Sequence, residues 1–152
     1  MTAPRERAEI LLVEDEPADA HLTRFAFEEA GIAVHLHHVS HGFAALDFLH
    51  RRPPYGDAPR PGLILLDLNM PRMNGYEFMT ALRGEPGFAD IPVVVLTTSD
   101  VERDVEATRD HGAADYIVKP VDMDAFCHRM SRLAGEWRLP RSGGEPNGDK
   151  AE

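Results

Sequence analysis

Five short apolar segments, separated by stretches with helical spacing, constrain the fold of this chain more than any other feature. They recur about every 25 residues and read EILLV (9–13), VHLHHV (34–39), LILL (63–66), IPVVVL (91–96) and ADYIV (114–118). Strands that alternate with helices build a parallel sheet with helices on both faces. The third and fourth segments are continuously apolar, which is typical of strands covered on both faces. The sequence therefore predicts one α/β domain.

The helices expected between these strands have recognisable ends. Pro17 suits a first helical turn and Gly31 a helix stop, and between them Ala18, Leu22 and Phe25 mark one helical face. Capping side chains precede three later helices, namely Asn74 with Glu77, Ser99 with Glu102, and Asp122. The expected helices lie near 17–30, 42–50, 75–83, 100–110 and 122–137.

The composition excludes several classes of protein. Twenty-six acidic residues against sixteen Lys and Arg give a formal charge of −10, which argues against binding a nucleic acid backbone. The single cysteine, Cys127, cannot form an intrachain disulfide. No apolar run approaches the roughly 18 residues that a membrane helix needs. We therefore expect a cytoplasmic protein that binds neither nucleic acid nor membranes.

Both ends of the chain differ in composition from its middle. The C-terminal stretch RSGGEPNGDKAE contains one apolar residue, an alanine, and is too polar to bury a core. We expect residues 1–8 to form an N-terminal tail, 9–138 the folded domain and 139–152 a disordered C-terminal tail.

Polar side chains follow four of the five expected strands. The first strand ends in Glu14 and Asp15, the third in Asp67, the fourth in Thr97 and the fifth in Lys119. In an open parallel sheet the ligand crevice lies beyond the carboxyl ends of the strands, where the strand order reverses. If the strand order is the flavodoxin-like 2-1-3-4-5, three carboxylates converge there beside a hydroxyl and an ammonium group.

These groups suit a magnesium ion and a phosphoryl group. Clustered carboxylates repel one another unless a cation intervenes, and Mg²⁺ commonly bridges carboxylate and phosphate oxygens. Thr97 and Lys119 would supply a neutral donor and a compact positive charge to the remaining phosphoryl oxygens. We therefore interpret Asp67 as a nucleophile that accepts a phosphoryl group and forms an acyl phosphate.

Four sequence blocks, in this order, resemble one known family. The blocks LLVEDEP (11–17), LLDLNMPRMNG (65–75), VVVLTTS (93–99) and DYIVKPV (115–121) are similar to the signatures of the response regulator receiver family, whose chemotaxis member is CheY. The resemblance covers residues 9 to about 134. It implies a flavodoxin-like (βα)5 doubly wound parallel sheet with strand order 2-1-3-4-5. It also implies a place in a two-component system, as a phosphoprotein in phosphorelay signal transduction.

The resemblance further implies a role for single residues. Asp67 would accept the phosphoryl group from a histidine kinase, with Lys119 and Thr97 binding its oxygens. The Mg²⁺ ligands would be Glu14, Asp15, Asp67 and the backbone carbonyl of Asn69. Thr97 and Tyr116 would form the conformational switch, and a cis peptide bond would precede Pro120.

Two positions depart from the family pattern. Glu14 replaces the more usual aspartate, and its longer side chain leaves open whether it binds the ion directly or through water. Thr98 is bulkier than the small residue often found beside the switch threonine, which predicts altered rates of phosphorylation and dephosphorylation.

Two further segments point to a subgroup and to a dimer. The loop at 51–62 and the segment FCHRMSRLAGEWRLP (126–140) resemble the stand-alone regulators paired with bacterial phytochromes, so a bacteriophytochrome is the expected kinase. Output would then pass through the face formed by the fourth helix, fifth strand and fifth helix. The apolar stripe of the last helix is longer than a sheet needs, which predicts a homodimer whose face includes Phe126, Met130, Leu133 and Trp137.

Other functions fit parts of the pattern. An intermediate receiver in a phosphorelay would use the same residues. An aspartate-nucleophile phosphatase carries a second aspartate two residues after the nucleophile, where this chain has Asn69. A flavodoxin needs a glycine- and hydroxyl-rich phosphate loop, whereas EDEPAD (14–19) is acidic. A pseudo-receiver that only binds partners would not need the acceptor and the lysine. We therefore expect a signalling protein and not an enzyme.

Histidines gather around the second strand, at His35, His37, His38 and His41. Residues two apart on a strand share a face, so a zinc site is one interpretation. An edge strand with solvated histidines is the favoured one.

Overall fold

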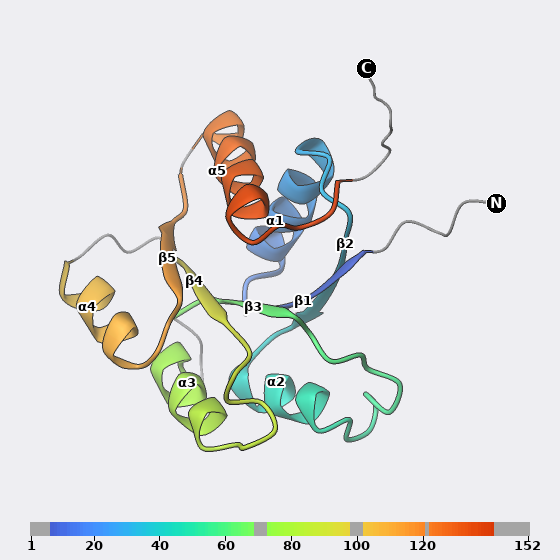
Figure 1. Cartoon of the computed structure of the whole chain (residues 1–152), viewed down its shortest axis with the longest axis vertical. Helices are drawn as coiled ribbons and strands as arrows, with labels where there is room; N and C mark the ends of the chain where they lie inside the picture. The colour runs from blue at the N-terminus through green and yellow to red at the C-terminus, as the bar shows by residue number, and fades with distance from the viewer. Residues whose placement is uncertain (1–6, 69–72, 98–101, 121, 142–152) are drawn as a thin grey trace.

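The strands and helices alternate along the whole folded part of the chain. The computed structural model describes residues 7–68, 73–97, 102–120 and 122–141. Its elements, labelled in Figure 1, are β1 (Ala8–Val13), α1 (Pro17–Glu29), β2 (Val34–Val39), α2 (Gly42–Leu49), β3 (Leu63–Leu66), α3 (Gly75–Arg83), β4 (Val93–Thr97), α4 (Glu102–Asp110), β5 (Asp115–Val118) and α5 (Met123–Glu136). These bounds agree with the sequence-based expectations to within two residues.

The five strands form one parallel sheet in the order β2-β1-β3-β4-β5, which confirms the predicted topology. Val13, the last residue of β1, lies opposite Val39 of β2 and Leu66 of β3. Because the three strands end at the same level, the residues that follow them meet at one edge of the sheet.

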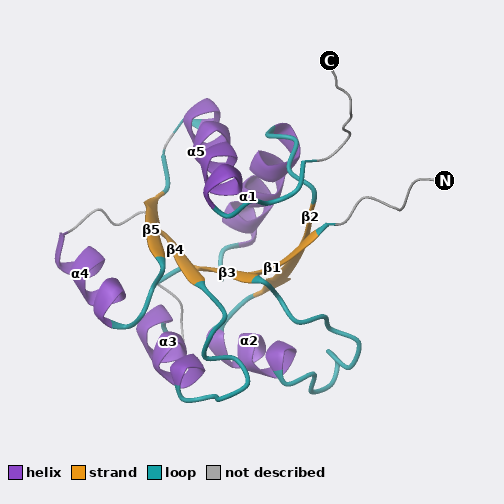
Figure 2. Ribbon diagram, viewed as in Figure 1, coloured by secondary structure: helices purple, strands orange, loops and turns teal. Residues whose placement is uncertain are grey.

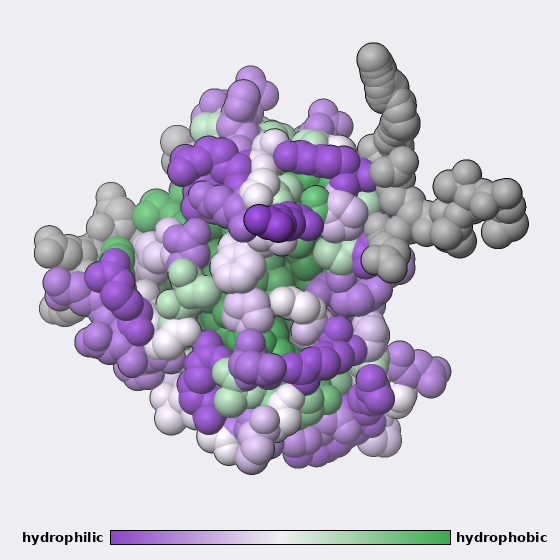
Figure 3. Space-filling model, in the orientation of Figure 1, coloured by the Kyte–Doolittle hydropathy of each residue, from purple (hydrophilic) through white to green (hydrophobic). Residues whose placement is uncertain are grey.

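Helices cover both faces of the sheet. Figure 2 shows α1 and α5 on one face, α2 and α3 on the other, and α4 beside the edge strand β5. Each face has its own cluster of buried apolar side chains, with Phe27 and Met130 on the first and Phe78 and Met79 on the second. Figure 3 shows hydrophilic side chains over much of the visible surface, in keeping with the formal charge of −10.

The expected capping residues hold the helix ends where the structure describes them. Asn74 and Glu77 form a reciprocal capping box, each accepting a backbone N–H of the other at 2.9 Å. The Asp122 side chain accepts the backbone N–H of Ala125 at 3.3 Å. Gly31 follows α1 with a φ of +71°, a left-handed conformation that glycine adopts at little cost. Ser99 lies outside the described residues.

The apolar face expected of α1 is wrong, because the helix buries a different side. Leu22 and Phe25 are 43% and 41% exposed, and Ala18 is exposed as well. The buried side chains of α1 are Ala20, Thr23, Ala26 and Phe27. Three of these four are small, so the helix can lie close to the sheet and to α5.

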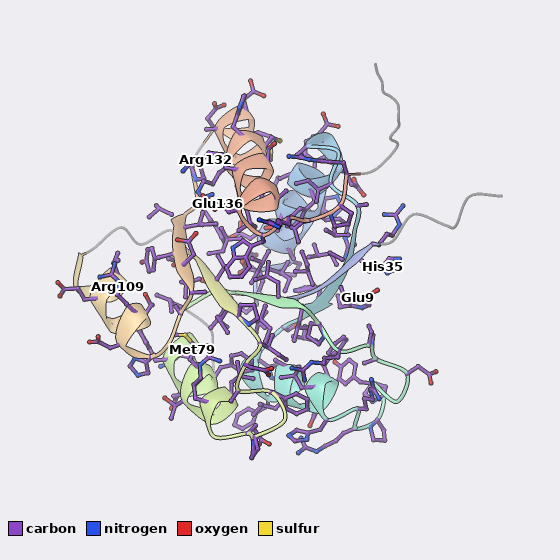
Figure 4. All side chains as sticks on the ribbon, in the orientation of Figure 1. Glu9, His35, Met79, Arg109, Arg132 and Glu136 are labelled. Carbon is purple, nitrogen blue, oxygen red and sulfur yellow. The ribbon has the colours of Figure 1, made fainter. Side chains whose placement is uncertain are left out.

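The apolar stripe of α5 is also misassigned as a dimer face. Phe126, Met130 and Leu133 belong to this chain's own core, with Leu133 fully buried, and Trp137 packs against the same cluster. Figure 4 labels Arg132 and Glu136, which are on the solvent side of the helix. The stripe is long because α5 packs on α1 as well as on the sheet. Homodimerisation stays a prediction, and the fully buried Leu133 could not contribute to its interface.

The loop at 51–62 and the C-terminal end are anchored more firmly than their composition predicts. Ala58 is buried in the core, and the Arg51 guanidinium donates to its carbonyl at 2.7 Å. At the other end, the backbone N–H of Ala33 donates to the carbonyl of Pro140 at 2.7 Å. The part of the chain that the structure describes continues to residue 141, three residues beyond the expected boundary of the folded domain.

Two further expectations concern the backbone and the membrane. In the described part of the chain the cis peptide bond joins Pro53 and Pro54, and the one expected before Pro120 is not found. None of the helices in the described ranges combines the length and the apolar composition needed to cross a bilayer.

Candidate functional site

The ends of β1 and β3 bring two acidic residues together. Glu14 and Asp67 are each the first residue after their strands, and these strands are neighbours. The backbone N–H of Asp67 donates to the carbonyl of Val13 at 3.0 Å, which continues the pairing of the strands up to the acid. The predicted switch point of the sheet is therefore where the acids lie.

Three carboxylates form a cluster at this edge. Glu14, Asp15 and Asp67 each offer an oxygen within 4.8 Å of the other two, a spacing that one metal ion can span. Glu14 is 1% exposed and Asp67 8%, whereas Asp15 is exposed. Two buried carboxylates beside an exposed one repel each other and are costly to desolvate. A hard divalent cation that keeps some of its water suits this oxygen-rich, open-sided donor set.

Lys119 lies beside the cluster and pairs with two acids. Its Nζ is 2.7 Å from Oε1 of Glu14 and 3.1 Å from Oδ2 of Asp19. Burial by itself would lower the pKa of Lys119, but the two carboxylates outweigh it and raise the pKa above its ordinary value. The ammonium group therefore stays charged and is available to an anion.

Asp19 was not expected at the site. It lies in the first turn of α1, and its carboxylate accepts a hydrogen bond from the Lys119 ammonium group. The sequence carries no local signal for this contact, because Asp15 lies outside the helix and Lys119 is 100 residues away in the chain.

Glu14 is engaged by the protein at both oxygens. Oε1 accepts Lys119, and Oε2 accepts the backbone N–H of Glu16 at 3.3 Å. His38 also contacts this turn, with Nε2 2.7 Å from the backbone carbonyl of Glu14. Lys119, the backbone N–H of Glu16 and His38 thus all hold the turn that carries Glu14 and Asp15.

Thr97 and Tyr116 are on the neighbouring strands. Thr97 is the last residue of β4 and is fully buried, and its carbonyl accepts the backbone N–H of Lys119 at 2.7 Å. Tyr116 lies on β5 opposite Val95, half-buried against the core of the α2 and α3 face. Thr97 is thus at the carboxyl end of its strand, whereas Tyr116 lies two residues before the end of β5. The switch role of Tyr116 stays a prediction.

Gly75 shapes the turn after Asp67 and was not singled out from the sequence. A Cβ at this position would lie 2.9 Å from the Cα of Leu68 and 3.0 Å from the carbonyl oxygen of Asp67. Only glycine allows the start of α3 to pass so close to the backbone of Asp67 and Leu68. The backbone carbonyl of Asn69 and the side chain of Thr98 lie outside the described residues.

The histidines around β2 have protein partners. Glu9 accepts His35 at 2.8 Å and His37 at 2.7 Å, while His41 caps α2 through the N–H of Ala44. Within the described ranges, the group that fits a metal ion is the acidic one at the strand ends, and it includes no histidine. This geometry favours a structural role for the histidines.

Comparison with known proteins identifies the family. The model of the response regulator receiver domain matches residues 10–131. This chain belongs to the response regulator receiver family. Receiver domains are signalling modules that bind a divalent metal at an acidic pocket, which is where Glu14, Asp15 and Asp67 meet.

Similar proteins include a phytochrome response regulator and a regulator from red light signalling. Response regulator Rcp1 of Synechocystis sp. is 42% identical over 128 residues, which cover 84% of this chain and 87% of Rcp1. The phosphorylated cyanobacterial phytochrome response regulator RcpA superposes with a TM-score of 0.80 at 32% identity, covering 89% of this chain and 99% of RcpA. RPA3017, from red light signalling of R. palustris, superposes with a TM-score of 0.82 at 30% identity, covering 89% of this chain and 99% of RPA3017. The predicted resemblance to the phytochrome subgroup is confirmed.

A metal-bound relative is also known. The Mn²⁺-bound form of Rcp1 superposes with a TM-score of 0.76 at 36% identity, covering 88% of this chain and 94% of that structure.

Proposed function

We propose that this receiver accepts a phosphoryl group on Asp67 from a sensor histidine kinase, with Mg²⁺ as the ion at the acidic cluster. The observation that carries the proposal is the packing of Asp67 with Glu14 and Asp15, together with a buried lysine beside them. A cluster of carboxylates is costly unless a cation neutralises it, and a divalent cation bound there can also bind phosphate oxygens.

The transfer needs positioning more than activation. A carboxylate oxygen of Asp67 attacks the phosphorus of a phosphohistidine, the phosphorus–nitrogen bond breaks, and the imidazole leaves with the electron pair and takes up a proton. Asp67 reaches this position because its backbone N–H is fixed to Val13. A bound Mg²⁺ supplies positive charge to the phosphoryl oxygens during the transfer.

The other site residues hold the product. The Lys119 ammonium group and the Thr97 hydroxyl donate to phosphoryl oxygens. Asp15 and Asp67 would hold the ion directly. Glu14 would bind it directly or through water, because its two carboxylate oxygens also accept Lys119 and the N–H of Glu16.

Output would pass through the face of α4, β5 and α5. The phosphoryl group would attract the Thr97 hydroxyl at the end of β4. Tyr116 on the next strand would respond by changing its packing. Tyr116, Val105 and Arg109 line a groove between α4 and β5, and Figure 4 shows Arg109 on α4. A change in Tyr116 would therefore alter a surface that a partner can contact.

The expected donor is a bacteriophytochrome kinase, in the cytoplasm. Support comes from the kinship with Rcp1, with RcpA and with a protein of red light signalling. The chain would then act as a switch without turnover of a substrate of its own.

Acetyl phosphate with Mg²⁺ tests the acceptor. We expect the intact protein to gain the mass of one phosphoryl group, and Asp67→Asn to gain nothing. Asp57→Asn, which neutralises an exposed aspartate in the 51–62 loop, is the matched control and should be phosphorylated normally. A folded wild-type protein that gains no mass, or an Asp67→Asn protein that does, would contradict the proposal.

The donor is tested by phosphotransfer from purified kinases. A bacteriophytochrome kinase should transfer phosphate to this chain faster in one light state than in the other. Equal transfer in both states, with faster transfer from an unrelated kinase, would remove the phytochrome from the proposal and leave the acceptor unaffected.

A further inference from the structure

Lys119 is shared between two carboxylates that come from different elements. Glu14 follows β1 and Asp19 belongs to α1, and their oxygens lie 2.7 Å and 3.1 Å from the same Nζ atom. The side chains of Lys119 and Glu14 are 11% and 2% exposed, so their pair is largely removed from water, while Asp19 is 37% exposed. Asp19 is thus the partner that can be changed with least disturbance to the core.

The two carboxylates differ in their relation to the metal cluster. Glu14 belongs to the group of oxygens that one ion can span, whereas Asp19 does not. A cation bound at the cluster competes with Lys119 for Glu14, but it leaves Asp19 as a counter-ion of the lysine. A phosphoryl group on Asp67 must then attract an ammonium group that already has a partner.

We propose that Asp19 is a positioning residue that competes with the phosphoryl group for Lys119 and so weakens the hold of the site on phosphate. This inference rests on the proposed function of Asp67 as acceptor. The ammonium group of Lys119 has three N–H donors, but it cannot be closest to Asp19 and to the phosphoryl group at the same time. The two anions therefore compete for it.

A simpler role for Asp19 predicts a different result. An aspartate in the first turn of a helix is stabilised by the helix dipole, and Asp19 is in the first turn of α1. If that were its whole role, its neutralisation would lower stability slightly and leave phosphate binding unchanged.

Beryllofluoride, which mimics a phosphoryl group on a carboxylate, provides the test. With saturating Mg²⁺, titration calorimetry of Asp19→Asn should give a Kd about threefold to fivefold lower than that of the wild-type protein, the range expected from losing one partly exposed ion pair. Asp19→Glu restores the carboxylate and should return the Kd towards the wild-type value.

Glu16→Gln is the matched control for charge. Glu16 is the exposed N-cap of α1, and its side chain makes no capping hydrogen bond, so the variant removes one negative charge from the same turn without touching Lys119. Its Kd for beryllofluoride should be unchanged. An equal tightening in Glu16→Gln would show a general field effect and overturn the proposal.

A measurement on the metal-free protein tests the ion pair between Lys119 and Asp19 without the phosphate mimic. The ¹⁵N resonance of the Lys119 ammonium group should move in Asp19→Asn and stay in place in Glu16→Gln. If the wild-type protein binds no beryllofluoride, the proposed function fails. If it binds and Asp19→Asn has the wild-type Kd, or leaves the Lys119 resonance unmoved, the role of Asp19 alone is refuted.

Discussion

The two ends of the sheet use charged side chains in opposite ways. At the carboxyl ends of the strands, Glu14, Asp15 and Asp67 crowd together, and Lys119 pairs with one of them, Glu14. At the amino ends, arginines donate to the backbone carbonyls of the loops that lead into the strands. The carboxyl end therefore gathers more negative than positive charge, whereas the arginines at the amino end are bound by backbone carbonyls.

Arg83 best illustrates the amino end. Its Nη1 donates to the carbonyl of Ala89 at 2.6 Å, and its Nη2 to that of Gly112 at 2.8 Å, so one side chain joins the loops before β4 and β5. A Cβ at Gly112 would lie 2.8 Å from Nε of Arg83, so the glycine leaves room for the guanidinium group.

Arg60 does the same on a neighbouring loop, donating to the carbonyl of Gly87 at 2.6 Å and to Asp90 at 2.8 Å. The contrast teaches that a charge satisfied by backbone carbonyls stabilises the fold, whereas a group of clustered acids carries a cost in stability that the proposed phosphoryl transfer would explain.

The largest change in the free energy of unfolding should come from a substitution at the amino end of the sheet. Arg83→Ala should lower the free energy of unfolding by about 2–3 kcal/mol, because it leaves carbonyls in two loops without their charged donor. Urea denaturation followed by circular dichroism measures this change. Arg52→Ala, which breaks an exposed pair with Asp47, is the control and should cost less than about 1 kcal/mol. Equal costs would remove the special role of Arg83.

Magnesium should stabilise the carboxyl end. At about ten times its Kd, Mg²⁺ should raise the free energy of unfolding by about 1.4 kcal/mol, since it binds the folded protein alone. Thermal unfolding with and without the ion measures the gain, and NaCl at matched ionic strength is the control. A gain of the same size in Asp67→Asn would locate the ion away from the cluster.

Neutralising an acid should change the free energy of unfolding in opposite directions at the two ends of the sheet. In the metal-free protein, Asp67→Asn should raise the free energy of unfolding by about 1 kcal/mol, because it relieves repulsion among buried carboxylates. Denaturation in the presence of a chelator measures it. A decrease would mean that Asp67 is balanced by cations even in the absence of metal.

The smallest effect concerns Glu9, at the start of β1. Figure 4 labels Glu9 and His35 on adjacent strands. Burial alone would raise the pKa of Glu9, but hydrogen bonds from His35 and His37 lower it below its ordinary value of 4.5. Because the pKa in the folded state is the lower one, the stabilising effect is present above pH 4.5 and is lost as the pH falls through the folded value.

Glu9→Gln should therefore lower the free energy of unfolding by less than about 1 kcal/mol at neutral pH. The difference from the wild-type protein should shrink as the pH falls below 4.5. Denaturation curves at a series of pH values measure the trend. A difference that grows towards acid pH would contradict this assignment.

Strand ends were well predicted because their signals are local. Short continuous apolar runs end abruptly in Glu14, Asp67, Thr97 and Lys119, and parallel topology alone carries these residues to one edge. Capping residues such as Asn74 and Asp122 act on backbone groups within three residues, so they too could be identified from the sequence. The four signature blocks then identified the family before any geometry was known.

The faces of α1 and α5 could not be predicted in this way. Leu22 and Phe25 are exposed while Ala20 and Ala26 are buried, because closeness to α5 favours small side chains over large ones. Leu133 is buried because α1 and the chain end near Leu139 cover it. Asp19 joins the site only through the position of α1 relative to β5.

By itself the sequence determined the order of the elements, the edge at which the acids meet and the family, because each depends on residues close together in the chain or on the handedness of parallel connections. The tertiary structure alone decided which helix faces are buried, which acids share Lys119 and which loops the arginines hold. These are contacts between elements far apart in sequence, and they depend on helix positions that packing fixes and periodicity does not.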